Sequence, residues 1–245
     1  MSTSTSETGP APVKQLRLPG QAAAPEGPVD LTIMYLMHHA FRRDLQRFVA
    51  AITHTPMTER ATWQAIALRW ERFGEILHHH HTVEDDEIWP VLRERGTDAD
   101  REHLDAMEAE HDEIDPLLAS VGAGLAPLSG DTLPSDAADR RAALVVRISA
   151  ARDSLGRHLA HEETDALVIV QHHLTPTEFE VLHKDASAGM SVGLGFIVPW
   201  LAEDLPADAR EHVLREAGLP MRVLLWLTRG RFRRQERAAF RFGMA

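Results

Sequence analysis

Two pairs of histidine and glutamate could each bind a metal from one face of a helix. His80 and Glu84 are four residues apart, and His158 and Glu162 repeat this spacing further along the chain. Residues four apart lie one above the other on an α-helix, so each pair presents an imidazole nitrogen and a carboxylate oxygen on the same side. The two pairs therefore predict two helices that contribute metal ligands to one site.

The segments that carry these pairs also show apolar stripes. Four segments of the chain have apolar residues three and four apart, which is the pattern of a helix that buries one face. The second stripe continues to Val91, and the fourth includes Asp165. Each stripe contains one histidine where an apolar side chain is expected, and these are His38, His80, His111 and His158. Because a buried ionisable group is unfavourable unless it is paired or bound to metal, the pattern predicts a shared metal site in the core. The candidate ligands are His38, His80, Glu84, His111, His158 and Glu162.

The chemistry of these six ligands suits two metal ions. The chain has 15 histidines and no cysteine, so every side-chain ligand of a metal is a nitrogen or an oxygen atom. Imidazole combined with carboxylate favours iron or manganese, and zinc is less favoured for an open pair of ions. Glutamates in the core of a helix bundle can bridge two ions, and six protein ligands leave positions for water or a small ligand.

A run of four histidines, residues 78–81, precedes the first of these glutamates. The apolar stripe passes through His80, so its three histidine neighbours are expected to face solvent or contacts between helices. A register in which His81 and Asp85 replace His80 and Glu84 is the main alternative.

Several polar residues could support the ligands without binding metal. His161 and Glu163 fall off the stripe and could orient the ligands through hydrogen bonds. Asp115 could form a hydrogen bond near His111. Tyr35 lies one turn before the first candidate ligand, and we expect it mainly to pack in the core, although its hydroxyl could donate a hydrogen bond near an oxygen-activating metal.

The four stripes predict an all-α protein built on an antiparallel four-helix bundle. The expected helices span about residues 30–53, 58–95, 98–121 and 136–173, and their connections are short enough to join antiparallel neighbours. Pro90 is expected to bend or break the last turns of the second helix. The chain has one tyrosine and few β-branched runs, so strands are not expected.

The two ends of the chain differ from the bundle in composition. Residues 1–28 are rich in Ser, Thr, Pro, Ala and Gly, and we expect a disordered tail there, followed by the metal-binding bundle over residues 29–173. Residues 174–245 are expected to form a helical C-terminal extension that packs on the bundle. The basic stretch RGRFRRQER, residues 229–237, is a candidate contact for a redox or protein partner.

Composition narrows the functional classes. The formal net charge of −11 argues against a general nucleic-acid binder. No signal-peptide pattern is visible, and no run of about 18 apolar residues suggests a membrane span, so the cytoplasm is the expected location. The sequence has neither a Gly-x-Ser-x-Gly nucleophile motif nor a Gly-rich phosphate-binding loop.

By their order and phase, four motifs resemble the hemerythrin-like, or HHE cation-binding, family. They are HHAFRRDL (38–45), HHTVEDDEIWPVL (80–92), AEHDEID (109–115) and HLAHEETDALV (158–168), and the resemblance covers about residues 30–173. It implies a four-helix bundle with two non-haem iron ions in its core. It also implies that the protein binds, senses or reduces a small diatomic or peroxide ligand, such as oxygen, nitric oxide or hydrogen peroxide.

The chain departs from the pattern of the oxygen-carrying hemerythrins at two ligand positions. Met107 stands where that pattern has a histidine one turn before His111, and Glu162 lies four residues after His158 where the pattern has an aspartate at five. One iron is therefore expected to have fewer protein ligands, which favours sensing or redox chemistry over oxygen carriage. The alternatives are a di-iron enzyme (a peroxidase, a catalase-like protein or an oxygenase acting on a small organic substrate) and a structural metal-binding bundle.

Overall fold

The chain folds into helices that follow the periodicity of its sequence. The computed structural model describes residues 11–187 and 192–243, and within these ranges it has no β-strand, only an isolated bridge between Val13 and Gly27. The helices are α1 (Thr32–His54), α2 (Arg60–Val83), the π-helical segment η1 (Glu84–Ile88), α3 (Trp89–Arg95), α4 (Asp98–Ser129), α5 (Ala137–His161), the π-helical segment η2 (Glu162–Ala166), α6 (Leu167–His173), α7 (Pro176–Ser187), α8 (Leu194–Leu201), α9 (Ala207–Glu216) and α10 (Gly218–Phe240). The expectation of an all-α fold is confirmed.

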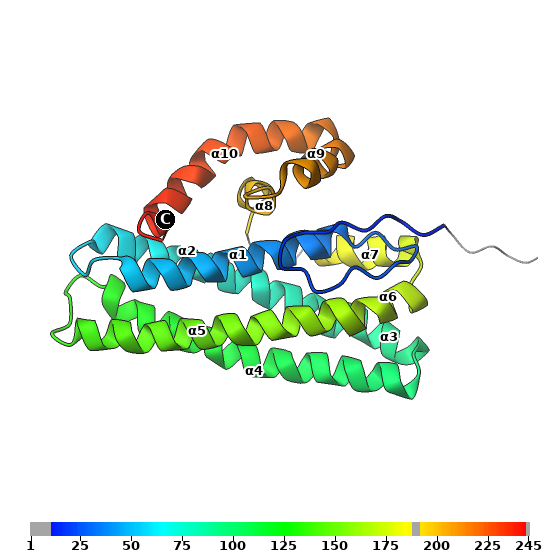
Figure 1. Ribbon diagram of the computed structural model, residues 1–245, viewed down its shortest axis with the longest axis horizontal. Helices are drawn as coiled ribbons and strands as arrows, with labels where there is room; N and C mark the ends of the chain where they lie inside the picture. The colour runs from blue at the N-terminus through cyan, green and yellow to red at the C-terminus, as the bar shows by residue number, and fades with distance from the viewer. Residues whose placement is uncertain (1–10, 188–191, 244–245) are drawn as a thin grey trace, which may run out of the picture.

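Four long helices, α1, α2, α4 and α5, lie side by side and form a bundle (Figure 1). Successive members run in opposite directions along the bundle, and α3 and α6 extend α2 and α5 through η1 and η2. The facing sides bury an apolar core whose largest members include Phe41, Phe48, Trp63 and Phe73. Burial of a side chain such as phenylalanine stabilises the fold by about 1.5–3 kcal/mol, so the core holds the ligand-bearing helices firmly.

The third bundle helix is longer than the sequence suggests. α4 continues to Ser129, whereas the apolar stripe and the following glycines predict an end near residue 121. Gly124 lies inside this helix, where a Cβ atom would come within 2.9 Å of Cδ1 of Leu144 on α5. The glycine therefore permits a close approach of two helices and does not mark a loop.

The N-terminal segment is ordered over most of its length. Residues 11–28 run along the bundle without helical structure and bury Leu16 and Leu18. The expectation of a disordered tail over residues 1–28 is therefore wrong for this part, and residues 1–10 lie outside the described residues. A composition poor in apolar residues hides the two leucines, which find partners on a bundle that the segment alone cannot reveal.

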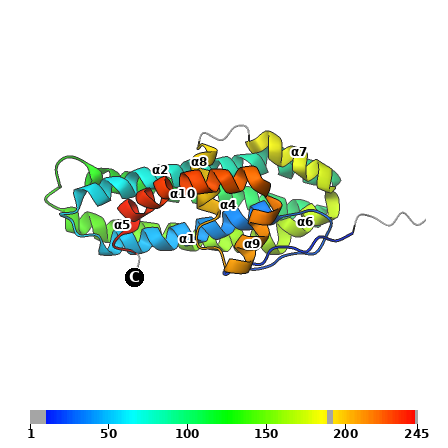
Figure 2. The ribbon, with the colours of Figure 1, turned by 90° about the horizontal axis from the view of Figure 1, so that it is seen from above.

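The C-terminal extension covers one side of the bundle. α10 crosses α2 and α1, and α8 packs against both α10 and α1 (Figures 1 and 2). The extension is helical and packs on the bundle, as the sequence predicts. In the described part of the chain, no helix has the length and apolar character needed to cross a membrane.

A buried network of ion pairs fastens this extension to the bundle. Asp44 of α1 is fully buried and accepts hydrogen bonds from Arg43 and Arg69. It also accepts one from the indole N–H of Trp200 in α8, at 2.7 Å. Arg69 donates a further hydrogen bond to Glu236 of α10, at 2.7 Å. Burial works against the charge of Asp44, but Arg69 and Arg43 lower its pKa on balance, so the carboxylate stays ionised.

Replacing Asp44 with alanine should strongly lower the free energy of unfolding. The change leaves the buried Arg69 guanidinium without one of its counter-charges, and breaking comparable buried pairs costs about 3–5 kcal/mol. Chemical denaturation followed by circular dichroism measures the loss. Asp204→Asn is the control, because the Asp204 side chain is 57 % exposed and pairs with Arg47 at the surface. Its effect should stay below about 1 kcal/mol, and equal stability of the two variants would contradict the anchoring role of Asp44.

Candidate metal centre

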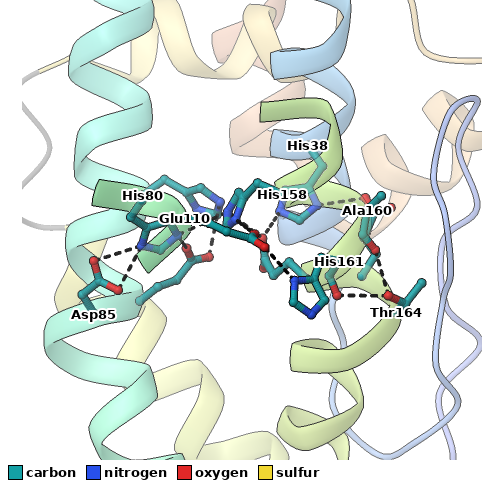
Figure 3. Close-up of polar contacts among 12 residues, drawn as sticks. His38, His80, Asp85, Glu110, His158, Ala160, His161 and Thr164 are labelled. Carbon is teal, nitrogen blue, oxygen red and sulfur yellow. Dashed lines mark hydrogen bonds and ion pairs between the residues drawn. The ribbon is translucent and has the colours of Figure 1, made fainter. Parts of the chain in front are cut away.

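Seven side chains that can bind metal meet in the middle of the bundle. They come from the four long helices and from the first residue of each π-helical segment, and they are His38, His80, His81, Glu84, His111, His158 and Glu162. Each is buried, with at most 5 % of its surface exposed. Figure 3 shows His38, His80 and His158 entering the same space from different helices. The structure thus brings all six predicted ligands together and adds His81 to them.

One group of ligand atoms belongs to His38, His80 and Glu162. Their nitrogen and oxygen atoms all lie within 4.8 Å of one another. Nε2 of His38 is 3.1 Å from Oε2 of Glu162, and the rings of His38 and His80 meet edge to face with centroids 5.5 Å apart. One cation could contact all three side chains.

A second group consists of His81, His111 and His158. One ring nitrogen of each lies within 4.8 Å of the others, and the Nε2 atoms of His111 and His158 are 3.2 Å apart. The rings of His81 and His111 stack at a centroid distance of 3.9 Å. This group offers three imidazoles to one cation.

Two glutamates connect the groups. Oε1 of Glu84 lies 3.3 Å from Nε2 of His80, and its Oε2 lies 3.6 Å from Nε2 of His111. Oε2 of Glu162, which approaches His38, also lies 3.9 Å from Nε2 of His158. Each carboxylate therefore faces a histidine from both groups, which is the placement that a bridge between two ions requires.

Several ligand atoms of the centre have no hydrogen-bond partner among the described residues, as expected where a cation fits. Buried atoms without a hydrogen-bond partner include Nε2 of His38 and of His80, both ring nitrogens of His81, and all four carboxylate oxygens of Glu84 and Glu162. An unsatisfied buried polar group costs about 1–3 kcal/mol. So many in one place, all converging, match the donor set of a cation-binding site.

Carboxylates around the centre orient three of its histidines. The pairs are His38–Glu163, His111–Asp85 and His158–Glu110, and in each pair the ring Nδ1 lies 2.9 Å from a carboxylate oxygen. An ionised carboxylate can only accept, so Nδ1 carries the proton and Nε2 presents its lone pair to the centre. Partners of this kind fix the tautomer and the ring orientation of metal-binding histidines.

Glu163 shows how strongly one such partner is held. It is fully buried and accepts hydrogen bonds from Arg42 at 2.7 and 3.0 Å and from the backbone N–H of Ala22 at 2.6 Å. Burial opposes its ionisation, but the hydrogen bonds from His38 and Arg42 lower its pKa on balance. The predicted orienting role of Glu163 agrees with this geometry, and the N-terminal segment contributes to it through Ala22.

The two π-helical segments explain which residues face the core. A π-helical turn holds more residues than an α-helical turn, so the buried face moves along the chain by about one position. Beyond η1, Leu92 is buried and Val91 is only half-buried, although the sequence pattern places Val91 in the core. Beyond η2, Ala166 is buried where the pattern places Asp165. π-helical turns often occur at functional sites, and here each begins at a glutamate of the centre.

His81 is buried in the centre, although the sequence pattern predicts that it faces solvent or a contact between helices. The stripe through His80 predicts that His81 points away from the core, yet only 3 % of its surface is exposed. The alternative register is correct about His81 and wrong about its partner, because Asp85 contacts His111 instead. Both His80 and His81 reach the centre, so the two registers are not exclusive. His81 lies in α2 before η1 begins, and an apolar stripe that selects one of two neighbouring residues gives no signal for a second ligand beside His80.

Other expected supporting residues lie further away. Asp115 does not reach His111; its carboxylate lies 3.9 Å from the exposed His78. His161 hydrogen bonds to Glu110 on the side away from the centre (Figure 3). Tyr35 is buried in the core as expected, and its hydroxyl has no hydrogen-bond partner in the part of the chain that the structure describes.

Burial and the neighbouring charges set the protonation of the side chains in the centre. Burial, together with the nearby Glu162, raises the pKa of Glu84 well above its ordinary value. Burial lowers the pKa of His80 and of His81 well below theirs, so both rings are neutral, which is the form that binds metal. For His38, the neighbouring glutamates outweigh burial and raise the pKa to about 9. In the absence of metal, a protonated His38 balances the charge of Glu162.

Comparison with known proteins agrees with this geometry. A family model described as hemerythrin HHE cation binding domain matches residues 29–170, the part of the chain that forms the bundle and carries all seven residues of the centre. Comparison with curated proteins and with solved structures gives no match. Since the match covers more than half of the sequence, the chain belongs to the hemerythrin HHE cation-binding domain family.

Proposed function

We propose that the centre binds two non-haem iron ions and that the protein binds, senses or reduces a small ligand there, such as oxygen, nitric oxide or peroxide. The observation that carries the proposal is the set of buried nitrogen and oxygen atoms that converge without hydrogen bonds. A donor set of imidazole and carboxylate suits iron or manganese better than zinc in an open dinuclear site. Bound iron supplies electrons and Lewis acidity.

The geometry supports an unequal division of the histidines. His81, His111 and His158 would hold one ion, His38 and His80 would hold the other, and Glu84 and Glu162 would bridge them. The ion beside His38 and His80 would have fewer protein ligands, which would leave room for a small ligand. We infer that the small ligand binds on that side.

His81 offers a replacement for the histidine that is missing at position 107. Met107 is fully buried on α4 and contributes no nitrogen ligand. The ring of His81 enters from α2 and stacks on His111. The third histidine thus comes from a different helix, so Met107 does not reduce the ligand count and reversible oxygen binding remains compatible with the donor set.

The surrounding residues keep water out and offer one proton donor. The ring of Phe41 lies 5.4 Å from the ring of His80 and closes one side of the centre with an apolar surface. Burial raises the pKa of Tyr35, and the charges of Glu163 and Glu162 raise it further, so its hydroxyl keeps its proton. That hydroxyl has no partner within the described residues and can donate a hydrogen bond to a small ligand.

A cavity elsewhere in the molecule helps to choose between functions. It has a volume of about 580 Å³ and lies between α1 and the helices α8, α9 and α10 of the extension. α1 contributes Leu36 and Met37 to its wall, but none of the seven residues of the centre lines it. An oxygenase needs its organic substrate next to the metal, and this cavity does not provide such a place.

Metal content and an optical spectrum of untagged protein test the proposal directly. We expect about two irons per chain, with near-ultraviolet bands that change on addition of azide, peroxide or nitric oxide. Protein that contains only zinc, or whose iron bands do not respond to any of the three, would contradict a redox function and leave a structural bundle.

The His81→Ala variant should lose one of the two ions. Removing an orienting partner of a ligand lowers metal affinity by about 10- to 100-fold, and removing a ligand should lower it further. Iron per chain, measured after dialysis, should fall from about two to about one. His78→Ala is the matched control, because the His78 side chain is 72 % exposed, and it should keep both ions. Full iron retention in His81→Ala would exclude His81 as a ligand.

A further inference from the structure

A second group of metal-ligating side chains lies outside the centre. It consists of His103 on α4, His161 at the end of α5 and Asp165 in η2. One ligand atom from each lies within 4.8 Å of the others, and all three residues are half-buried, so the group is accessible to ions in solution. The rings of His103 and His161 face each other edge to face, with centroids 5.9 Å apart.

The hydrogen bonds of His161 prepare it to bind an ion. Its Nδ1 lies 2.9 Å from Oε1 of Glu110, a carboxylate that also accepts from Nδ1 of His158. Since the carboxylate accepts both bonds, Nδ1 of His161 carries its proton and Nε2 has a free lone pair. A histidine held in this way by a carboxylate has the arrangement typical of a metal ligand.

The spacing of the remaining atoms also fits an ion better than a hydrogen bond. Nε2 of His161 lies 3.8 Å from Oδ2 of Asp165, which is too long for a hydrogen bond. Two ligand atoms bound to one ion at about 2.1 Å lie about 3–4 Å apart. The hydroxyl of Thr164 lies 2.7 Å from the same carboxylate oxygen and 3.1 Å from the backbone carbonyl oxygens of Ala160 and His161.

The π-helical turn is what brings Asp165 to this group. The apolar stripe of the sequence places Asp165 in the core, but η2 moves the buried face to Ala166. The carboxylate therefore lies at the bundle surface, one helical turn beyond His161 and opposite His103. Two helices converge here, because His161 and Asp165 lie four residues apart on the continuous helix of α5 and η2, and His103 comes from α4.

We propose that His103, His161 and Asp165 form a third cation site, which takes a divalent transition metal such as Fe²⁺ or Zn²⁺. Two imidazoles and one carboxylate are a donor set that such ions bind, with water at the remaining positions. Glu110 lies between this outer site and the centre, since it bonds to His161 on one side and to His158 on the other. The outer site does not depend on which metal occupies the centre.

Zinc binding to the full-length, metal-loaded protein tests this site. Equilibrium dialysis against Zn²⁺, followed by elemental analysis of zinc and iron, should give about one more zinc per chain for the natural protein than for His103→Ala or Asp165→Asn. The iron content should be the same in all three. Affinity for this zinc should fall at least about tenfold in each variant.

His172→Ala is the matched control, because it removes an exposed histidine on α6 outside the group and should retain the extra zinc. The same zinc content and affinity in the natural protein, in His103→Ala and in Asp165→Asn would overturn the proposal. Loss of iron from His103→Ala would mean that this change also disturbs the centre. The zinc content of Asp165→Asn would then test the outer site, because asparagine keeps the size and shape of the aspartate side chain.

Discussion

The burial of Glu84 and Glu162 among five histidines is the constraint on which this structure depends. Within the described residues neither glutamate has a hydrogen-bond partner, and their carboxylates face Nε2 of His38 and of His80, which also lack one. A protein core cannot hold two such carboxylates as anions unless positive charge lies between them. The site therefore makes physical sense as a cation-binding centre, and the folded bundle must supply enough stability to hold its ligands together before the ion arrives.

Much of the surrounding architecture serves this requirement. Carboxylates behind the centre fix the orientation of the rings, and Arg42 together with the backbone of Ala22 holds one of those carboxylates in turn. α1 carries His38 on its buried face and, less than two turns later, Asp44, which anchors the C-terminal extension. One helix thus joins the metal centre to the network that fastens α8 and α10 to the bundle.

The sequence predicts the helices and six residues of the centre because both follow the 3.6-residue period of the α-helix. Apolar residues three and four apart define the buried faces, and a histidine on such a face is conspicuous. The same reasoning fails at Val91 and Asp165, because a π-helical turn changes the period and leaves no mark in an apolar stripe. It fails at His81, which lies in α2 before η1, because a stripe selects only one of two neighbouring residues. It also fails for residues 11–28, whose order comes from packing against the bundle and not from their own composition.

The π-helical segments have a consequence for the shape of the bundle. Each accommodates about one residue more than an α-helical turn, and one residue corresponds to about 100° of rotation about a helix axis. α3 and α6 therefore have a different rotational phase from α2 and α5, and they contact each other at the far end of the bundle. Deleting one residue from either segment would keep the chain helical but turn α3 or α6 away from its neighbour. The helices α2 and α5 therefore differ in rotational phase from their continuations α3 and α6. The metal centre lies where the phase changes, at the start of η1 and η2.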